Sequence, residues 1–588
     1  MTRQAADASV YHGDALVAGE ASGAVLASDV ELSLWGGVDP ATGRVIDRHH
    51  PLCGEMLRGR ILAIPGGRGS SSSSGVLLEL LLNGHGPAAL VLERADDILA
   101  LGVIVAEEVF AASIPVLVLE REHFRAVRAA AHARIAGNAI ACAAEPASLR
   151  EPPRTASAEA DADDGLTLEA VDQDMFAGRQ GPAAAAAMRI LVRLARLQGA
   201  ERFIDVSRVH IDGCIYTGPA SLRFAEQLRD LGARVAVPTT LNALSVDHRH
   251  WRAQGVDPGI GEPASRLGDA YIAMGAQPTF TCAPYLLDEV PARGEQIAWA
   301  ESNAVVFANS VLGARTLKYP DYLDLCIALT GRAPQAGCHR DAHRRAGVCL
   351  WVPARDTADD AFYPLLGHCA GRAAADRVPA LIGLESADPS TDDLKAFGAA
   401  FATTSGAAMF HIVGVTPEAP TLEAATGGAA DLETVTITRN DLRADWQALN
   451  SAEPAPVDLV SLGNPHFSLS ECLKLRALCA GRQRHQAVRL VITCSRAIHE
   501  QARAAGAVAA LEAFGAEFVT DTCWCMIGEP LIPPHARVIM TNSAKYAHYG
   551  PGMTGRAFRF AGLADCVEAA VTGCAPAVDP FVATTTPS

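Results

Sequence analysis

Short apolar runs alternate with turn-forming residues in the first part of the chain. The runs Ile61–Ile64, Ala88–Leu92 and Ile114–Leu119 predict strands, and the segment Val76–Leu82 predicts a helix. Strands and a helix at this spacing indicate a compact domain of α/β or β-barrel-like type.

The pattern changes after about residue 165, where Ala/Leu-rich helical stretches separate the strand-like runs. Helices are predicted over Ala183–Gln198 and Pro219–Leu231. Strands are predicted over Arg202–Val206, Arg234–Val237, Ala304–Phe307, Ala380–Leu384, Asp431–Arg439, Val457–Leu462, Ala487–Thr493 and Arg537–Thr541. Because strands alternate with helices, we expect parallel α/β layers here.

A segment poor in large apolar residues separates the two patterns. Residues 145–165 read EPASLREPPRTASAEADADDG, which is typical of a solvated interdomain linker. The predicted division is a small domain over 1–144, a linker over 145–165 and a large domain over 166–588 with two or three subdomains.

Composition and charge narrow the possible partners. The 588 residues carry a formal net charge of −17 without a basic run, which argues against nucleic acid and anionic membranes as partners. No apolar stretch has the length of a membrane span, and the N-terminus does not resemble a signal peptide. We therefore expect a cytoplasmic protein, and a monomer.

The chain has 15 cysteines and no C-x-x-C motif. In a reducing compartment most of them are expected to be buried free thiols. Any metal site must then be assembled from cysteines that lie far apart in the sequence.

The strongest local motif is a Gly/Ser loop between a predicted strand and a predicted helix. It reads PGGRGSSSSSG over residues 65–75, and it offers glycine flexibility, hydroxyl groups and the free N–H groups of a helix start. A flexible serine linker is the alternative, but it would not normally stand between a strand and a helix. The missing Gly-Lys-Ser/Thr ending excludes a P-loop.

Further polar clusters follow strand-like runs, where the sites of α/β proteins form. His210 and Asp212 in VHIDG are candidates to bind a carboxylate, although His210 is equally consistent with a satisfied loop histidine. The histidines of DHRHW and GCHRDAHRR are interspersed with arginines, which favours a solvated or anion-binding face over metal ligation. The other clusters are TCAPY, AWAESN, NSVLGART, GNPHFS, DTCWC and NSAKYAHY.

Together these motifs resemble the aconitase X family. SLWGGVDPATGRVID, HPLCG and GGRGSSSSSG resemble its small subunit, and TCAPY, AWAESNAVVFANSVLGART, GNPHFS, DTC and TNSAKYAHY resemble its large subunit, in the expected order. The resemblance implies a swivelling small domain that carries the catalytic serine among Ser70, Ser71 and Ser72. It also implies a large multi-layer α/β domain, aconitase-like, that holds an iron–sulfur cluster.

The resemblance also implies a cluster ligand set. Cys282 and Cys523 match ligand positions, whereas Asn464 stands where the archaeal pattern has a cysteine. Loss of that thiolate favours a smaller cluster, [2Fe–2S], over a four-iron cluster. We select Cys369 as the third ligand, with Cys338 and Cys525 as alternatives.

The implied activity is the dehydration of a small hydroxy amino acid, cis-3-hydroxy-L-proline, to Δ1-pyrroline-2-carboxylate. A serine would remove the α proton and iron would activate the 3-hydroxyl. Dehydration of mevalonate 5-phosphate or another hydroxy acid is the first alternative, a non-catalytic iron-sensing protein is the second, and a degenerate relative without a cluster is the third. The substrate-binding candidates are Arg68, His210, Asn303, Arg315, His466 and Lys545.

Overall fold

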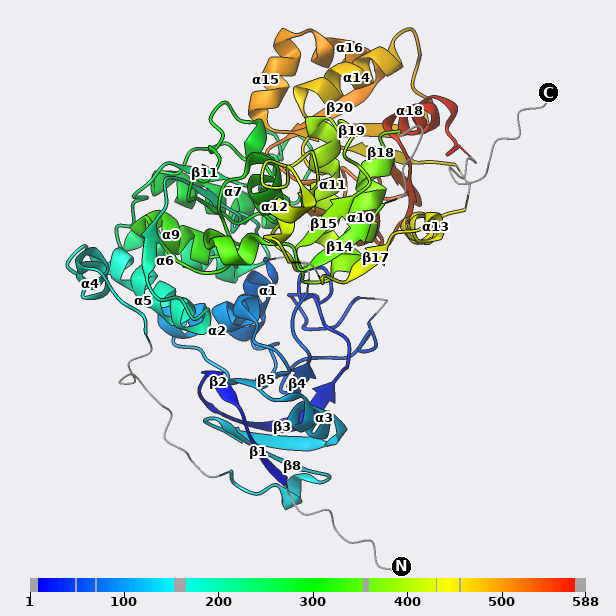
Figure 1. The fold of residues 1–588 in the computed structure, drawn as a ribbon. Helices are drawn as coiled ribbons and strands as arrows, with labels where there is room; N and C mark the ends of the chain where they lie inside the picture. The colour runs from blue at the N-terminus through cyan, green and yellow to red at the C-terminus, as the bar shows by residue number, and fades with distance from the viewer. Residues whose placement is uncertain are drawn as a thin grey trace, which may run out of the picture.

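The computed structural model describes residues 9–47, 50–68, 71–152, 165–352, 359–429, 431–453 and 456–576. A small N-terminal domain lies against a larger body built from three further α/β regions (Figure 1). Within the described residues, no helix combines the length and the apolar character that crossing a membrane requires.

The small domain is built on an eight-stranded sheet in the order β1-β8-β7-β3-β4-β5-β6-β2. Its two edge strands, β1 and β2, are consecutive in the chain, so one bent segment pairs with both sides and nearly closes a barrel. Gly13 lies at the bend, where a Cβ atom would approach the Val118 carbonyl oxygen to 2.1 Å. The expected barrel-like α/β domain is confirmed. Its elements are β1 Ser9–His12, β2 Asp14–Val17, β3 Glu20–Ala27, β4 Ile61–Ile64, α1 Ser73–Leu82, β5 Ala89–Leu92, α2 Asp97–Phe110, β6 Val116–Val118, α3 Arg121–Ala129, β7 His132–Ala136 and β8 Ala139–Ala143.

The region after residue 165 contains a short parallel sheet in the order β11-β10-β12 and an antiparallel pair, β13 with β9. Helices surround both. Its elements are α4 Ala170–Phe176, α5 Pro182–Leu197, β9 Phe203–Asp205, β10 Val209–Ile211, α6 Pro219–Asp230, β11 Thr239–Leu241, α7 Pro258–Ala273, β12 Ala298–Trp299, α8 Ser302–Phe307, α9 Leu323–Thr330 and β13 Arg332–Pro334.

Two all-parallel sheets form the rest of the large body, with strand orders β16-β15-β14-β17 and β20-β19-β18-β21-β22. In the second sheet the strand order reverses between β18 and β21, and such a switch point opens a crevice at the carboxyl ends of the strands. The elements are β14 Val348–Trp351, α10 Phe362–Ala374, β15 Pro379–Ile382, α11 Thr391–Thr404, β16 His411–Ile412, α12 Leu422–Thr426, β17 Thr434–Thr436, α13 Arg439–Leu449, β18 Leu459–Leu462, α14 Leu469–Cys479, β19 Arg489–Cys494, α15 Arg496–Ala504, α16 Ala507–Phe514, β20 Ala516–Thr520, β21 Val538–Thr541, α17 Ala544–Thr554, β22 Ala557–Phe560 and α18 Leu563–Thr572.

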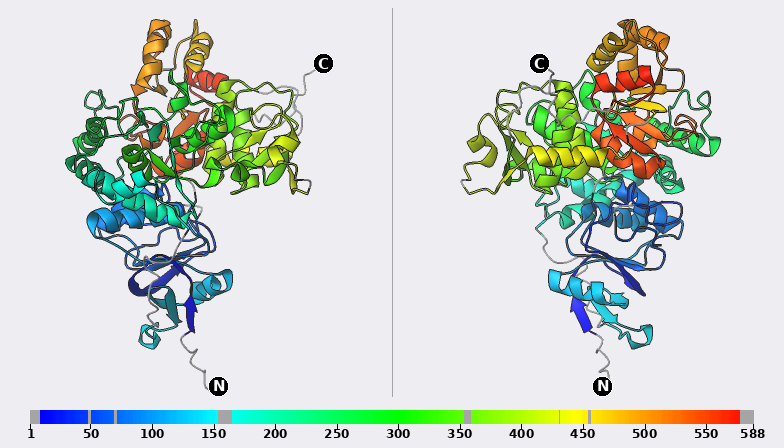
Figure 2. Two further views of the ribbon diagram at one scale, coloured as in Figure 1. Left: turned by 60° about the vertical axis from the view of Figure 1, so that its left-hand side comes forward. Right: turned by 90° about the vertical axis from the view of Figure 1, so that its right-hand side faces the viewer.

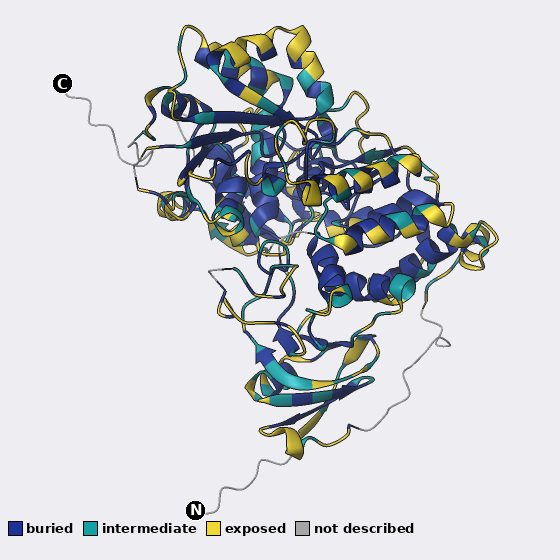
Figure 3. Ribbon diagram, turned by 180° about the vertical axis from the view of Figure 1, so that it is seen from behind, coloured by how far each residue is buried: buried dark blue, intermediate teal, exposed yellow. Residues whose placement is uncertain are grey.

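Helices α1 and α2 join the small domain to the large body. Helix α1 packs on α6 and α2 packs on α5, and the two views of Figure 2 both place the small domain against the region of α5 and α6. Residues from both domains form one continuous apolar core, and the ribbon at the contact is largely buried (Figure 3). The small domain is therefore docked through well-packed helices.

Two strand predictions are wrong. Ala304–Phe307 belongs to helix α8, which begins where the Glu301 side chain accepts a hydrogen bond from the Ala304 N–H. Short apolar runs do not distinguish a buried strand from a buried helix. Arg234–Val237 forms no strand, and the strand β11 begins only at Thr239.

Candidate active site

A cavity lies where the carboxyl ends of strands from two parallel sheets meet the Gly/Ser loop of the small domain. Its volume, including the solvent at its open mouth, is about 570 Å³. Strand β10 leads to Asp212, β12 to Glu301 and β20 to the cysteines at 523 and 525. Trp35 and Ser72 complete the lining from the small domain. Both domains therefore contribute to the lining of the cavity.

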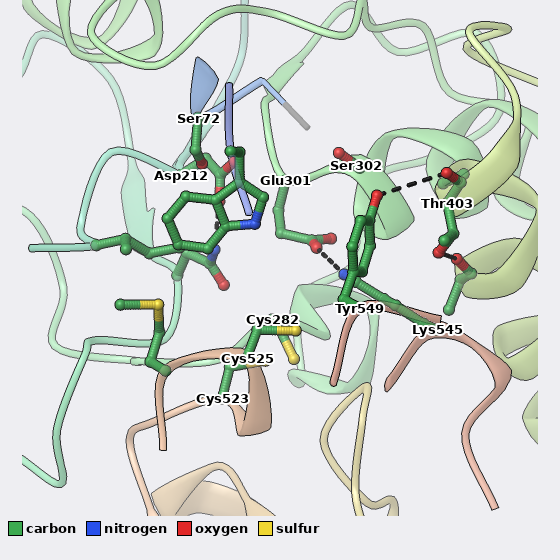
Figure 4. Close-up of a pocket in the computed structure, with 16 residues that line it drawn as sticks. Ser72, Asp212, Cys282, Glu301, Ser302, Thr403, Cys523, Cys525, Lys545 and Tyr549 are labelled. Atoms are coloured by element: carbon green, nitrogen blue, oxygen red, sulfur yellow. Dashed lines mark hydrogen bonds and ion pairs between the residues drawn. The ribbon is translucent and has the colours of Figure 1, made fainter. Parts of the chain in front are cut away.

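The Gly/Ser loop brings two serines to buried carboxyl groups of the large body. Ser71 is fully buried, and its hydroxyl donates to Oδ2 of Asp212 at 2.9 Å. Ser72 is the N-cap residue of α1 and lines the cavity beside Asp212 (Figure 4). Ser70 lies outside the described residues.

Three cysteine thiols gather at another wall of the cavity (Figure 4). Cys282 and Cys523 are 3% and 8% exposed, Cys525 is partly buried, and hydrogen bonds link Cys523 to both of the others. Soft thiolates are the donors that iron–sulfur clusters use. Within the described ranges, no group of three or more His, Cys, Asp and Glu side chains is arranged to hold a single metal ion. The three thiols are donors of the kind that an iron–sulfur cluster uses.

His466 and Asn464 support the cysteine loops from the turn after β18. The His466 backbone N–H donates to Sγ of Cys282 at 3.3 Å, and its ring Nε2 donates to the Thr522 carbonyl oxygen at 2.7 Å. The Asn464 amide donates to Sγ of Cys525 at 3.3 Å. Burial lowers the pKa of His466 to about 4, so its ring is neutral at physiological pH. His466, predicted to bind substrate, here holds two loops together.

The turn before Cys523 depends on an ion pair. Asp521 is fully buried with φ at +65°, a conformation that is uncommon for residues other than glycine. Its carboxylate accepts two hydrogen bonds from Arg496, at 2.9 and 2.7 Å. This bidentate pair fixes the backbone that delivers Cys523 to the cavity.

Lys545 is the ammonium group on the cavity wall, and it pairs with Glu301 at 3.0 Å. Burial alone would lower the pKa of Lys545, but the Glu301 carboxylate and the nearby thiols raise it well above its usual range. Asn303 lies behind this pair and donates to the Cys282 carbonyl oxygen at 2.9 Å. Lys545 thus presents a positive charge to the cavity, and Asn303 supports the Cys282 loop.

Four other predicted site residues do not line the cavity. Arg68 pairs with Asp47 at 2.9 Å near the mouth, and Arg315 pairs with Asp341. His210 is fully buried in β10, where burial lowers its pKa to about 3. Cys369 lies in α10, in a different apolar cluster from Cys282 and Cys523, and it does not line the cavity.

Sequence reasoning missed several acidic residues of the site. Glu301 lines the cavity, and Asp321 and Asp324 lie buried beneath the Gly/Ser loop. The signal was present in YPDYLDL, where two carboxyl groups stand within an otherwise apolar and aromatic run. Buried carboxyl groups require hydrogen-bond partners, so such a run indicates a polar site.

Comparisons with known proteins match nearly the whole chain to one family. The profiles of the aconitase X swivel, first, second and third domains match residues 10–142, 165–342, 346–447 and 457–572. Proteins named cis-3-hydroxy-L-proline dehydratase from Pseudomonas aeruginosa and Hypocrea jecorina are 59% and 56% identical. Each alignment covers 96% of this chain, and 96% and 95% of the respective relative. The crystal structure of Thermococcus kodakaraensis aconitase X in its holo-form matches with a TM-score of 0.63 and 33% identity, over 69% of this chain and 100% of that one.

Proposed function

Because the chain belongs to the aconitase X family, we propose that it is a dehydratase that converts cis-3-hydroxy-L-proline to Δ1-pyrroline-2-carboxylate. Two relatives that carry the name of this activity align with nearly the whole chain at 56% and 59% identity.

The observation that carries the proposal is the joint position of Ser72 and the three thiols on one cavity. Elimination of water requires a base for the α proton and a means of helping a poor leaving group depart. Ser72 comes from the small domain and the thiols come from the large body. The base and the activation of the leaving group would therefore come from opposite sides of the same cavity.

We assign Cys282, Cys523 and Cys525 as the residues that would hold an iron–sulfur cluster, [2Fe–2S] in our proposal. Cys525 replaces Cys369 in this ligand set because it shares the cavity with the other two thiols. Asn464 contacts Cys525 through its amide, and an amide does not replace a thiolate ligand. When bound, the cluster would supply a Lewis acid that polarises the bond to the 3-hydroxyl.

The side chains of this protein would bind and deprotonate the substrate. The Lys545 ammonium would neutralise the substrate carboxylate, which makes the α proton more acidic, and Glu301 holds that ammonium in place at 3.0 Å. The Ser72 oxygen, at the N-terminus of α1, would accept the α proton. The enamine formed would tautomerise to the cyclic imine.

The test is turnover by anaerobically purified protein of known iron content. Incubation with cis-3-hydroxy-L-proline is expected to give an imine that o-aminobenzaldehyde traps, and Ser72→Ala is expected to abolish it without loss of iron. Mevalonate 5-phosphate serves as the comparison substrate. Dehydration of that compound, with none of the amino acid, would show that the substrate assignment is wrong.

A further inference from the structure

Three buried carboxyl groups lie together beneath the Gly/Ser loop. Asp212 follows β10, and Asp321 and Asp324 lie just before and at the start of α9; their exposed fractions are 3%, 4% and 0%. Among the residues that the structure describes, no Lys or Arg forms an ion pair with any of them. Three isolated charges at this depth would be strongly unfavourable, so their protonation needs an explanation.

Asp324 is satisfied as an anion. It accepts hydrogen bonds from the backbone N–H groups of Asp212 at 2.6 Å, Gly213 at 3.2 Å and Leu325 at 2.7 Å. Burial raises the pKa of Asp324 to about 6, and these N–H donors oppose the shift, so the carboxylate is charged at pH 7. Asp324 therefore fixes the backbone at Asp212 and leaves the other two carboxyl groups as a separate pair.

Both carboxylate oxygens of Asp212 accept hydrogen bonds, and Oδ1 of the neighbouring Asp321 is buried without a hydrogen-bond partner. Two ionised carboxylates in contact have no proton to donate, so a proton held between Asp212 and Asp321 would satisfy the buried oxygen. The donors to Asp212 are Ser71 and the Asn242 amide, while Ser72 hydrogen-bonds Asp321. Adjacent serines of the small domain thus contact the two members of one carboxyl pair.

We propose that Asp212 and Asp321 share one proton and act as the acceptor that draws a proton through Ser72 during turnover. The proposal rests on the dehydratase function assigned above. Ser72 and Asp212 both line the cavity, whereas Asp321 lies behind it, so Ser72 is the group that can pass a substrate proton to Asp321.

The proton transfer balances as follows. The α C–H bond of the substrate breaks, and its proton binds the Ser72 oxygen while the hydroxyl proton of Ser72 moves to Asp321 and the shared proton passes from Asp321 to Asp212. The electron pair left on the α carbon forms the double bond as the C3–O bond breaks and hydroxide departs. The pair then holds two protons and releases one to solvent, so that no free alkoxide is needed.

The surroundings of the pair support this role. Burial, followed by the charges of Glu301 and Asp324, raises the pKa of Asp212 to about 7, and Ser71 and Lys545 oppose the shift. Burial and the neighbouring carboxyl groups also raise the pKa of Asp321 well above its usual range. The other titratable groups near Asp212 are Lys318 and Cys214. A base that titrates near neutral pH is suited to general base catalysis at physiological pH.

Infrared difference spectroscopy of the whole protein tests the shared proton without any need for turnover. At pH 7 the wild-type protein is expected to show the carbonyl stretch of a protonated carboxylic acid. Asp321→Asn is expected to remove it, and Asp212→Asn to shift its frequency because the proton loses its second partner. Glu79→Gln is the matched control, because it removes a buried carboxyl group of the same domain contact without touching the pair. A band that Asp321→Asn leaves unchanged would overturn the proposal.

Turnover then tests the relay. Both Asn variants are expected to lower kcat about 100-fold with KM nearly unchanged, the size typical of a lost general base. They should also remove one ionisation from the pH profile of kcat/KM and increase the isotope effect of α-deuterated substrate. Folded variants with an unchanged pH profile and isotope effect would make the pair structural and refute the relay. An inactive wild-type protein that still shows the infrared band would instead refute the substrate assignment.

Discussion

The contact between Glu79 and α6 provides a quantitative test of domain docking. Glu79 belongs to α1 of the small domain, and its side chain is almost fully buried against the large body. Its carboxylate accepts a hydrogen bond from the Ala220 N–H at 2.7 Å, in the first turn of α6. Gly218 leaves room for this contact, since a Cβ there would lie 2.4 Å from the Glu79 carboxyl carbon.

Glu79→Ala leaves the Ala220 N–H without its partner. A hydrogen bond to a charged group contributes about 1.5–3 kcal/mol, and a carboxylate at a helix N-terminus adds about 0.3–1 kcal/mol. Because water replaces part of the contact when the domains separate, we expect a net loss of about 2 kcal/mol. This corresponds to roughly a 30-fold rise in the undocked population.

Hydrogen exchange measured by mass spectrometry is the assay. Peptides that cover α1 and α6 should exchange roughly 30-fold faster in Glu79→Ala, whereas β4 and β5, inside the small domain, should not change. Glu79→Gln keeps an acceptor for the N–H and should exchange at nearly the wild-type rate. Equal acceleration in β4 and β5 would mean that the substitution destabilises the domain itself, and unchanged exchange in α1 would mean that Glu79 does not hold the domains together.

Further predictions concern the thiols, the carboxyl pair and the turn before Cys523. Cys525→Ser should lower iron content and visible absorption after anaerobic purification, whereas Cys369→Ser should leave both unchanged; the reverse result would restore Cys369 as a ligand. The pKa of Asp212 rises from its ordinary 3.8 to about 7 on folding, so the folded state is favoured at low pH and loses stability as pH rises through that range. Asp212→Asn should therefore stabilise the protein more at pH 8 than at pH 5, by up to about 3 kcal/mol, measured as unfolding midpoints; an equal effect at both pH values would contradict this. Arg496→Ala removes the bidentate partner of the buried Asp521 carboxylate and leaves it only the 3.8 Å contact with Arg249, so a loss of about 3 kcal/mol in stability with poorer iron retention is expected. An unchanged unfolding midpoint would show that the pair is not needed.

Local sequence patterns were enough to identify the Gly/Ser loop as part of the site. The strand, the Gly/Ser loop and the helix over residues 61–82 are neighbours in sequence, so their order alone predicts that the serines stand at a helix start. Likewise, Pro219 marks the start of α6 and is visible in the sequence. Features of this kind depend on a few consecutive residues.

The rest of the site depends on contacts between distant segments. Asp212 and Asp321 are more than a hundred residues apart, and no periodicity relates them. Arg315 stands in a motif beside the site, yet its side chain turns to Asp341 on another loop. Residue type predicted a chemical role in each case, but only the packing of the sheets decides which side chains share a cavity.

The docking of the small domain has a consequence for the biogenesis of the protein. Trp35 and Ser72 of the small domain line the cavity together with the three thiols, so the docked small domain covers part of the space in front of them. A scaffold protein that delivers preassembled iron and sulfide would have to reach Cys282 and Cys523 before docking. Maturation would thus follow a fixed order, with the large body loaded first and the small domain closing afterwards, and a chain that closed too early would exclude its own cofactor.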